Sequence, residues 1–272
     1  MDASLNEILI AFLLTLFAGL STAIGSAIAF FARKASTSFL SWALGFSAGV
    51  MVYLSFVEIF PKAFESLALE MSETRAYTLT TLAFFGGVLL TGVIDRLVPD
   101  SVNPHEPKDY EDSSTPGNEK SYKQLMRMGL FTALAITLHN LPEGMATFIA
   151  AIEDPALGIT LAIAIAIHNI PEGIAVSVPI YYATGSKKKA FFYSAISGLA
   201  EPIGALVGFL VLSIFLTETL FGLIFAGVGG IMVYIALDEL LPTAEKYGAH
   251  HQVIYGLVLG MATMALSLMI FF

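Results

Sequence analysis

The sequence predicts an all-α membrane protein with eight membrane-spanning helices in a single domain over residues 1–272. Two observations lead to this fold class. Of the 272 residues, 56% are hydrophobic and only 13% are charged, whereas roughly a quarter of the residues of a soluble domain are charged. The apolar residues also come in long blocks, and about 20 apolar residues suffice for a helix to cross a hydrocarbon core about 30 Å thick. The composition therefore argues against a soluble enzyme and against a disordered protein.

Eight apolar blocks are each long enough to cross the membrane as a helix. Polar residues, Gly and Pro between the blocks mark where one helix ends and the next begins. The predicted spans are 7–31, 39–60, 77–98, 124–150, 156–182, 190–212, 219–241 and 252–272.

The chain has one long polar stretch, at residues 99–122, between the third and fourth spans. It combines acidic residues with Pro, Ser and Gly. A segment of this composition cannot bury enough apolar surface to offset the entropy that it would lose on ordering. We therefore expect a mobile loop at 99–122.

The positive charges indicate how the helices are oriented in the membrane. Eleven of the thirteen Lys and Arg residues lie in or beside the loops that follow the first, third, fifth and seventh spans, and only Lys62 and Arg75 lie on the other side. Loops rich in Lys and Arg stay in the cytoplasm. We therefore expect the 99–122 loop in the cytoplasm and both chain termini outside.

Two further features of the composition argue against classes of function. The net charge is −9 at pH 7, and no basic patch is available to meet phosphates, so a nucleic-acid partner is not expected. The chain has no cysteine, which removes disulfides, thiolate metal sites and cysteine nucleophiles.

A repeated segment relates the second span to the seventh. The segment GVMVYLSFVEIFPKA begins at Gly49 and the segment GIMVYIALDELLPTA begins at Gly230, at a constant offset of 181 residues. These two spans run in opposite directions, so the chain contains an inverted-topology repeat, a plan typical of transporters with a site near the middle of the bilayer. Each copy has a Glu three residues before a Pro, and we expect both carboxylates, Glu58 and Glu239, at solvated helix ends.

A second repeat brings ionisable residues to the middle of the membrane. HNLPEG occupies 139–144 in the fourth span, HNIPEG occupies 168–173 in the fifth, and Glu201 lies in the sixth. A charged side chain at the centre of a spanning helix costs about 2.5–3.5 kcal/mol. No Lys or Arg lies at that depth of any span, so we expect a bound divalent cation to neutralise these groups.

The spacing within each copy suits two neighbouring metal positions. His139 and Glu143 are four residues apart, and Asn140 and Glu143 are three apart, so the three side chains share one helix face. Each Glu can therefore bridge one position completed by His and another completed by Asn. The Pro of each copy frees a backbone carbonyl beside the cluster, and its Gly allows close helix approach. The second copy repeats this spacing with His168, Asn169 and Glu172.

The types of ligand narrow the choice of metal. Imidazole with carboxylate suits Zn²⁺, Fe²⁺, Co²⁺ and Mn²⁺. The position with Asn and carboxylate oxygens is harder and favours Fe²⁺ or Mn²⁺, and the absence of thiolates argues against Cu(I). We expect no catalytic cofactor.

The doubled H-N-x-P-E-G motif, the A-E-P-x-G run at 200–204, the eight spans and the polar loop after the third span together resemble the ZIP metal-ion transporters. Within that family the resemblance is closest to the bacterial zinc-uptake type called ZupT, and it covers essentially the whole chain. It implies a 3+2+3 arrangement of helices, a location in the cell membrane, a two-metal site between the fourth and fifth helices, and metal movement into the cytoplasm.

The resemblance also implies a role for individual residues. The His–Asn version of the second motif is associated with broad metal use, which adds Fe²⁺, Mn²⁺, Co²⁺ and Cd²⁺ to Zn²⁺. Met51 matches a position that in some relatives reaches the first metal from the second helix. The first metal position matches His139, Glu143, His168 and Glu172, and the second matches Asn140, Glu143, Asn169, Glu172 and Glu201.

Two alternatives to a metal carrier stay open. The same residues could serve a passive metal-selective channel. An intramembrane metal-dependent enzyme is less well supported, because the zinc-protease signature H-E-x-x-H is absent and the chain has His-x-x-x-Glu rather than the Glu-x-x-His pairs of diiron bundles. We therefore predict a transporter rather than an enzyme, with divalent metal ions and the lipid bilayer as its partners. The sequence leaves the oligomeric state open, a homodimer included.

Overall fold

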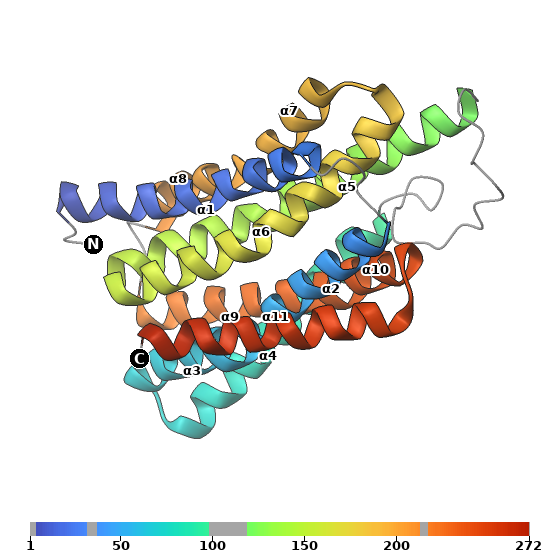
Figure 1. Cartoon of the computed structure of the whole chain (residues 1–272). Helices are drawn as coiled ribbons and strands as arrows, with labels where there is room; N and C mark the ends of the chain where they lie inside the picture. The colour runs from blue at the N-terminus through green and yellow to red at the C-terminus, as the bar shows by residue number, and fades with distance from the viewer. Residues whose placement is uncertain (1–3, 32–36, 98–118, 213–216, 272) are drawn as a thin grey trace.

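The computed structural model describes residues 4–31, 37–97, 119–212 and 217–271, and every regular element within these ranges is a helix (Figure 1). Two of these helices, η1 and η2, are short π-helical segments. The elements are α1 (Leu5–Phe31), α2 (Thr37–Leu54), η1 (Ser55–Ile59), α3 (Phe60–Glu70), α4 (Glu73–Leu97), α5 (Glu119–Glu153), α6 (Pro155–Thr184), α7 (Lys187–Gly198), α8 (Ala200–Leu212), α9 (Glu218–Ile235), η2 (Ala236–Leu240), α10 (Leu241–Tyr247) and α11 (His250–Phe271).

The helices pass eight times along the length of the molecule, because α2–η1–α3, α7–α8 and α9–η2–α10 each form one continuous pass (Figure 1). Each pass contains all or nearly all of one predicted span, and some passes extend beyond it. Seven of the described helical segments are long and apolar enough to cross a membrane. The eighth expected span, 124–150, lies within α5, where many side chains are outside the described part, so its role as a span remains a prediction.

The first helix begins where the last one ends, and only a few residues of the predicted polar loop belong to the described structure. α1 begins and α11 ends at the same end of the molecule, as an even number of passes requires (Figure 1). Which end faces the cytoplasm remains a prediction from the charges. Of the predicted loop 99–122, residues 119–122 form the first turn of α5, and residues 99–118 lie outside the described residues.

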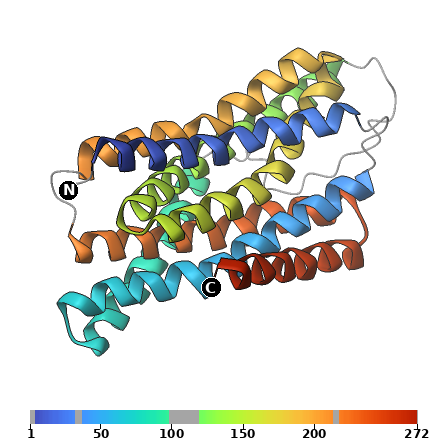
Figure 2. The ribbon, with the colours of Figure 1, turned by 60° about the vertical axis from the view of Figure 1, so that its left-hand side comes forward.

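The helices pack as two groups. The first group contains α1, α5, α6, α7 and α8, and the second contains α2 to α4 with η1, together with α9 to α11 with η2 (Figures 1 and 2). The most extensive contact between the groups is that of α2 with α6. Large apolar side chains on the outer surface, such as Leu89 and Leu210, are more than two-thirds exposed, as expected for helices that face lipid.

Glycines bring the helices of each group to backbone contact. A Cβ atom on Gly25 of α1 would lie 1.9 Å from the carbonyl oxygen of Ile170 in α6, and one on Gly49 of α2 would lie 2.0 Å from that of Leu257 in α11. Every described glycine whose Cβ would come within 3.0 Å of a neighbour meets a helix of its own group. Because small residues allow the close backbone packing that stabilises membrane helices, each group is packed more tightly within itself than against the other.

The inverted repeat is present in the backbone as a pair of π-helical segments. η1 and η2 begin 181 residues apart, and in both the chain continues as an α-helix with Pro in its first turn. In η1 the N–H of Phe60 donates to the carbonyl of Ser55, and in η2 the N–H of Leu241 donates to that of Ala236. The wider π turn and the Pro that follows it therefore recur together, and the π turn accommodates the hydrogen bond that the Pro cannot donate.

The prediction that Glu58 and Glu239 end their helices is wrong. Both lie inside the π segments, and the helices continue to Glu70 and Tyr247. Glu239 is only 5% exposed and Glu58 is half-buried. The expectation failed because Pro61 disfavours helix only in the turn that precedes it, and the π turn accommodates that loss.

Two tight turns link the helices that carry the predicted site. α5 and α6 are separated by Asp154 alone, whose carboxylate accepts the N–H groups of Ala156 and Leu157 and so caps α6. α6 and α7 are separated by Gly185, with a φ of 64°, and by Ser186, whose hydroxyl accepts the N–H of Lys189. These caps fix α5, α6 and α7 as consecutive antiparallel neighbours.

The sixth predicted span is interrupted at Leu199. α7 ends at Gly198 and α8 begins at Ala200, directly before Glu201. Pro202 has no N–H and cannot donate to the carbonyl of Gly198, four residues earlier, so the regular hydrogen-bond ladder fails at this point. The break lies beside the predicted site residue Glu201.

Candidate metal centre

Except for Met51, the predicted site residues lie on two neighbouring helices and a third. The first motif lies in α5, the second lies in α6, and Glu201 lies in the first turn of α8, which packs against α5. The prolines of the motifs do not end their helices, because α5 continues through Pro142 and α6 continues through Pro171. The predicted residues are therefore on the helices that the sequence assigned to them.

The motif glycines set how closely these helices approach. A Cβ atom on Gly144 of α5 would lie 2.0 Å from the carbonyl oxygen of Glu201, and one on Gly173 of α6 would lie 1.8 Å from that of Thr22 in α1. No other residue type fits at either position without moving a helix. The first glycine thus brings Glu201 against the first motif, and the second brings α1 against the second motif.

The predicted ligands whose side chains are described are all buried. Each is at most 1% exposed, and no Lys or Arg is buried among the described residues. Glu201 lies within electrostatic reach of both Glu143 and Glu172. The residues are Asn140, Glu143, His168, Asn169, Glu172, Glu201 and Met51.

A side-chain contact joins the two motifs. Nε2 of His168 in α6 lies 3.3 Å from each of the two carboxylate oxygens of Glu143 in α5. The histidine of the second motif therefore meets the glutamate of the first. A carboxylate and an imidazole held this close can bind the same metal ion.

The two motif asparagines direct their amide groups to backbone carbonyls. Nδ2 of Asn140 donates to the carbonyl of Ser197 at 3.0 Å. Nδ2 of Asn169 donates to the carbonyl of Ala18 at 3.0 Å and also to Oε1 of Glu201. These bonds fix the rotation of both amides and tie α5 and α6 to their neighbours α7, α1 and α8.

Three buried oxygen atoms of this cluster accept no hydrogen bond from the described residues. They are Oδ1 of Asn140, Oδ1 of Asn169 and Oε2 of Glu201. A buried acceptor without a donor is costly in a low-dielectric interior. Because a hard cation is bound by carboxylate and amide oxygens, these three atoms fit the second metal position that the resemblance implies.

The described side chains alone do not complete a metal site. Among them, no three His, Asp or Glu residues are grouped in an arrangement that could hold a metal ion. His139 lies in α5, but its side chain is outside the described part of the structure. The first metal position therefore remains a prediction, and so do the ligand roles of the other residues.

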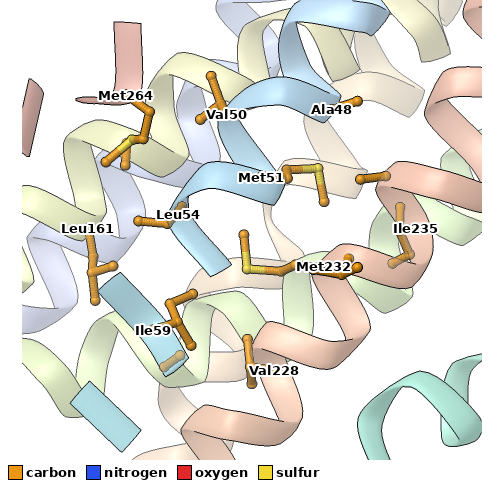
Figure 3. Close-up of a cluster of buried hydrophobic side chains, with 14 of the residues drawn as sticks. Ala48, Val50, Met51, Leu54, Ile59, Leu161, Val228, Met232, Ile235 and Met264 are labelled. Atoms are coloured by element: carbon orange, nitrogen blue, oxygen red, sulfur yellow. The ribbon is translucent and has the colours of Figure 1, made fainter. Parts of the chain in front are cut away.

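Met51 lies on a different helix from the other predicted ligands. It is fully buried in α2, within an apolar cluster that includes Leu54, Leu161 and Met232 (Figure 3). Met232 is its counterpart in the inverted repeat, 181 residues later. The structure brings α2 against α6, and the metal contact of Met51 remains a prediction.

Sequence reasoning missed the backbone partners of this site and one hydroxyl. The carbonyls of Ala18 and Ser197 hold the asparagine amides, and Oγ of Ser47 donates to the carbonyl of His168 at 3.3 Å. Backbone carbonyls have no signature in a sequence. The only available signal for Ser47 is its position four residues before Met51, on the same face of the second predicted span.

Comparison with known proteins gives one family. The profile of the family described as "ZIP Zinc transporter" matches residues 95–268. The chain is 60% identical to a protein named "Zinc transporter ZupT" from Nitratidesulfovibrio vulgaris over 272 aligned residues, which cover 98% of each chain. It is 59% identical to the protein of the same name from Oceanobacillus iheyensis, covering 98% of this chain and 99% of the relative. A third relative of that name, from Streptococcus mutans, is 56% identical over 96% of this chain.

The family match and the apolar helices lead to the same conclusion. The profile covers more than half of the chain, and the relatives match over nearly its full length. Seven described helices are able to cross a membrane. The chain is therefore a multi-pass protein of the cell membrane and belongs to the ZIP zinc transporter family.

Proposed function

We propose that this protein imports divalent metal cations, Zn²⁺ foremost, into the cytoplasm through the site between α5, α6 and α8. The names of the relatives support zinc as the substrate. The observation that carries the proposal is the buried set of oxygen acceptors of Asn140, Asn169 and Glu201 beside the carboxylates of Glu143 and Glu172. Divalent cations bound at two neighbouring positions would be ligated by these oxygen atoms.

The ligands divide into two positions in this proposal. His139 and His168 complete the first with the two glutamates Glu143 and Glu172. The softer, nitrogen-containing position suits Zn²⁺, Co²⁺ and Cd²⁺. Met51 adds a thioether to this position from α2. Asn140, Asn169 and Glu201 complete the second position, whose oxygen ligands suit Fe²⁺ and Mn²⁺.

The orientation and helix arrangement complete the proposal. The charges favour both termini outside, so that the motif helices α5 and α6 meet at the outer face in the turn at Asp154. In this proposal the helices are arranged as 3+2+3 along the chain, as the family resemblance implies. Metal then enters beside the α5–α6 turn and leaves on the side where the Lys and Arg residues lie.

Flux into proteoliposomes tests this function. Purified protein in metal-free vesicles should accumulate ⁶⁵Zn²⁺, whereas empty vesicles should not. Uptake that saturates with external zinc and that is accelerated by zinc inside the vesicle identifies a carrier, because a channel does not show counterflow. Uptake that rises without saturation would favour the channel alternative, and no uptake under any gradient would contradict the proposal.

A further inference from the structure

A hydrogen bond crosses the contact between the two helix groups at the candidate site. Oγ of Ser47 in α2 donates to the carbonyl oxygen of His168 in α6 at 3.3 Å. Both residues are fully buried. α2 belongs to the second group, whereas α6 carries the second motif and belongs to the first. The bond thus ties a metal-site residue to a helix that packs with the other group.

Other residues of the α2–α6 contact are apolar. Leu54 of α2 and Leu161 of α6 belong to one buried hydrophobic cluster that extends across the same helix contact (Figure 3). Apolar burial has no preferred direction, whereas a hydrogen bond has a preferred distance and angle. The hydroxyl of Ser47 therefore constrains how far α2 and α6 slide along each other in a way that the apolar contacts do not.

Each of the two helices is held firmly on its other side. A Cβ on Gly45 of α2 would lie 2.5 Å from the carbonyl of Val253 in α11, and a Cβ on Gly173 of α6 would lie 1.8 Å from that of Thr22 in α1. These contacts fix α2 and α6 within their own groups. The register between α2 and α6 is therefore set at their mutual contact, where Ser47 lies.

Ser47 and Met51 are one helical turn apart on the same face of α2. We propose that Ser47 is a positioning residue: its hydrogen bond to His168 sets the height of the Met51 thioether relative to the metal site and so tunes which metals the site accepts. This inference rests on the proposed function, and within it on the predicted role of Met51. It concerns a residue that is not among the predicted metal ligands.

The chain offers a matched control in the next part of the same pass. Oγ of Ser55 in η1 donates to the carbonyl of Met51 at 2.7 Å, four residues earlier in the continuous pass α2–η1. Ser55 is also fully buried. The two serines differ in the target of the bond: Ser47 bonds to α6, and Ser55 bonds within its own pass.

The experiment compares metal selectivity in proteoliposomes for Ser47→Thr, Ser47→Val and Ser55→Ala. Thr and Val have nearly the same shape and differ in the hydroxyl. We expect Ser47→Val to raise the KM for Cd²⁺ relative to that for Mn²⁺ by about three- to twenty-fold, the range of hydrogen bonds measured between membrane helices. The direction follows because a thioether favours the softer Cd²⁺. Ser47→Thr and Ser55→Ala should keep the wild-type ratio.

A double variant tests whether Ser47 acts through Met51. In a Met51→Leu background, Ser47→Val should change the Cd²⁺ to Mn²⁺ ratio no further, because the thioether that it positions is gone. A purely structural role would instead lower uptake of both metals alike. Thermal unfolding of each purified variant identifies any that fail to fold. The comparison of Ser47→Thr with Ser47→Val still measures the effect of the hydroxyl alone, because the two side chains have nearly the same shape.

Several outcomes would overturn the inference. Equal ratios for Ser47→Thr and Ser47→Val would mean that the hydroxyl has no role in selectivity. A change as large in Ser55→Ala would mean that any buried hydroxyl of this pass has the same effect. If wild-type protein transports no metal, the proposed function fails, and equilibrium binding of Cd²⁺ and Mn²⁺ to the purified variants still decides the role of Ser47: equal relative affinities in Thr and Val would refute it.

Discussion

The carboxylate of Glu143 and the imidazole of His168 meet across the α5–α6 hairpin, with Nε2 of the histidine 3.3 Å from both carboxylate oxygens. These two residues come from different copies of the repeated motif. The contact therefore joins the two copies of the motif. A substitution of either residue removes a contact in which both motifs take part.

The bridging role that we propose for the motif glutamates predicts a graded series of variants. Glu143→Gln keeps the shape of the side chain but removes the charge that serves both metal positions, so we expect uptake of every metal to fall to background. Asn169→Ala removes an oxygen ligand of the second position only. It should lower zinc uptake by less than about tenfold, the effect of losing one neutral hydrogen-bonding ligand, and should lower Fe²⁺ and Mn²⁺ uptake more.

Radioisotope uptake in proteoliposomes checks this series. Quantification of the protein in each vesicle preparation is the control for reconstitution. An equal loss for all metals in both variants would contradict two distinct positions and would favour a single undivided site.

Metal affinity should depend on pH in one direction. Imidazole binds a metal only when neutral and carboxylate only when ionised, so metal binding releases protons. Affinity should therefore be full at about pH 7.5 and should decline steadily toward about pH 5, because protons then compete for the ligands. Isothermal titration of purified protein with Zn²⁺ across this range measures the effect, and the same affinity at both ends would argue against His–Glu ligands.

The close approach at Gly144 predicts that two glycine substitutions differ sharply in their effect on stability and transport. In Gly144→Ala the new Cβ would lie 2.0 Å from the carbonyl oxygen of Glu201, so α5 and α8 must separate. We expect a loss of about 1–3 kcal/mol in the free energy of unfolding, the usual cost of overpacking, together with loss of transport. Gly86 in α4 has no atom within 4 Å of the corresponding position.

Gly86→Ala is thus the matched control. Because Ala favours helix over Gly by up to about 1 kcal/mol, it should leave transport unchanged and should keep or raise stability. Chemical unfolding in detergent micelles and zinc flux measure the two effects. Similar behaviour of the two variants would mean that the close approach of α5 and α8 is not needed.

A pair of cysteines tests whether the two motif histidines face each other. α5 and α6 are antiparallel and are joined by a one-residue turn, so His139 and His168 lie at similar distances along their helices from that turn. The chain has no native cysteine. The double variant His139→Cys, His168→Cys should bind Cd²⁺ far more tightly than either single variant, and Cd²⁺ should protect both thiols from a small alkylating reagent.

Mass spectrometry of the alkylated protein gives the readout. Each single variant controls for the reactivity of its own thiol. A double variant that binds Cd²⁺ no better than the single ones would show that the two positions do not share a metal.

The sequence by itself determined the helical passes and the candidate residues. Composition and the spacing of apolar blocks predicted eight helical passes, because a helix is the way for a single segment to satisfy its own backbone in lipid. The offset of 181 residues predicted a repeat, and the structure has the matched segments η1 and η2 at that offset. The motif glycines Gly144 and Gly173 were expected to allow close helix approach, and they do.

Tertiary structure alone decided which atoms meet. Nothing local in the sequence indicates that His168 meets Glu143, or that the amide of Asn169 is held by the carbonyl of Ala18 and by Glu201. The helix ends expected at Glu58 and Glu239 were wrong because a π turn, stabilised by its own hydrogen bonds, carries the helix past the Pro. Contacts between distant segments depend on how helices pack, and the backbone carbonyls that take part in this packing have no signature in a sequence.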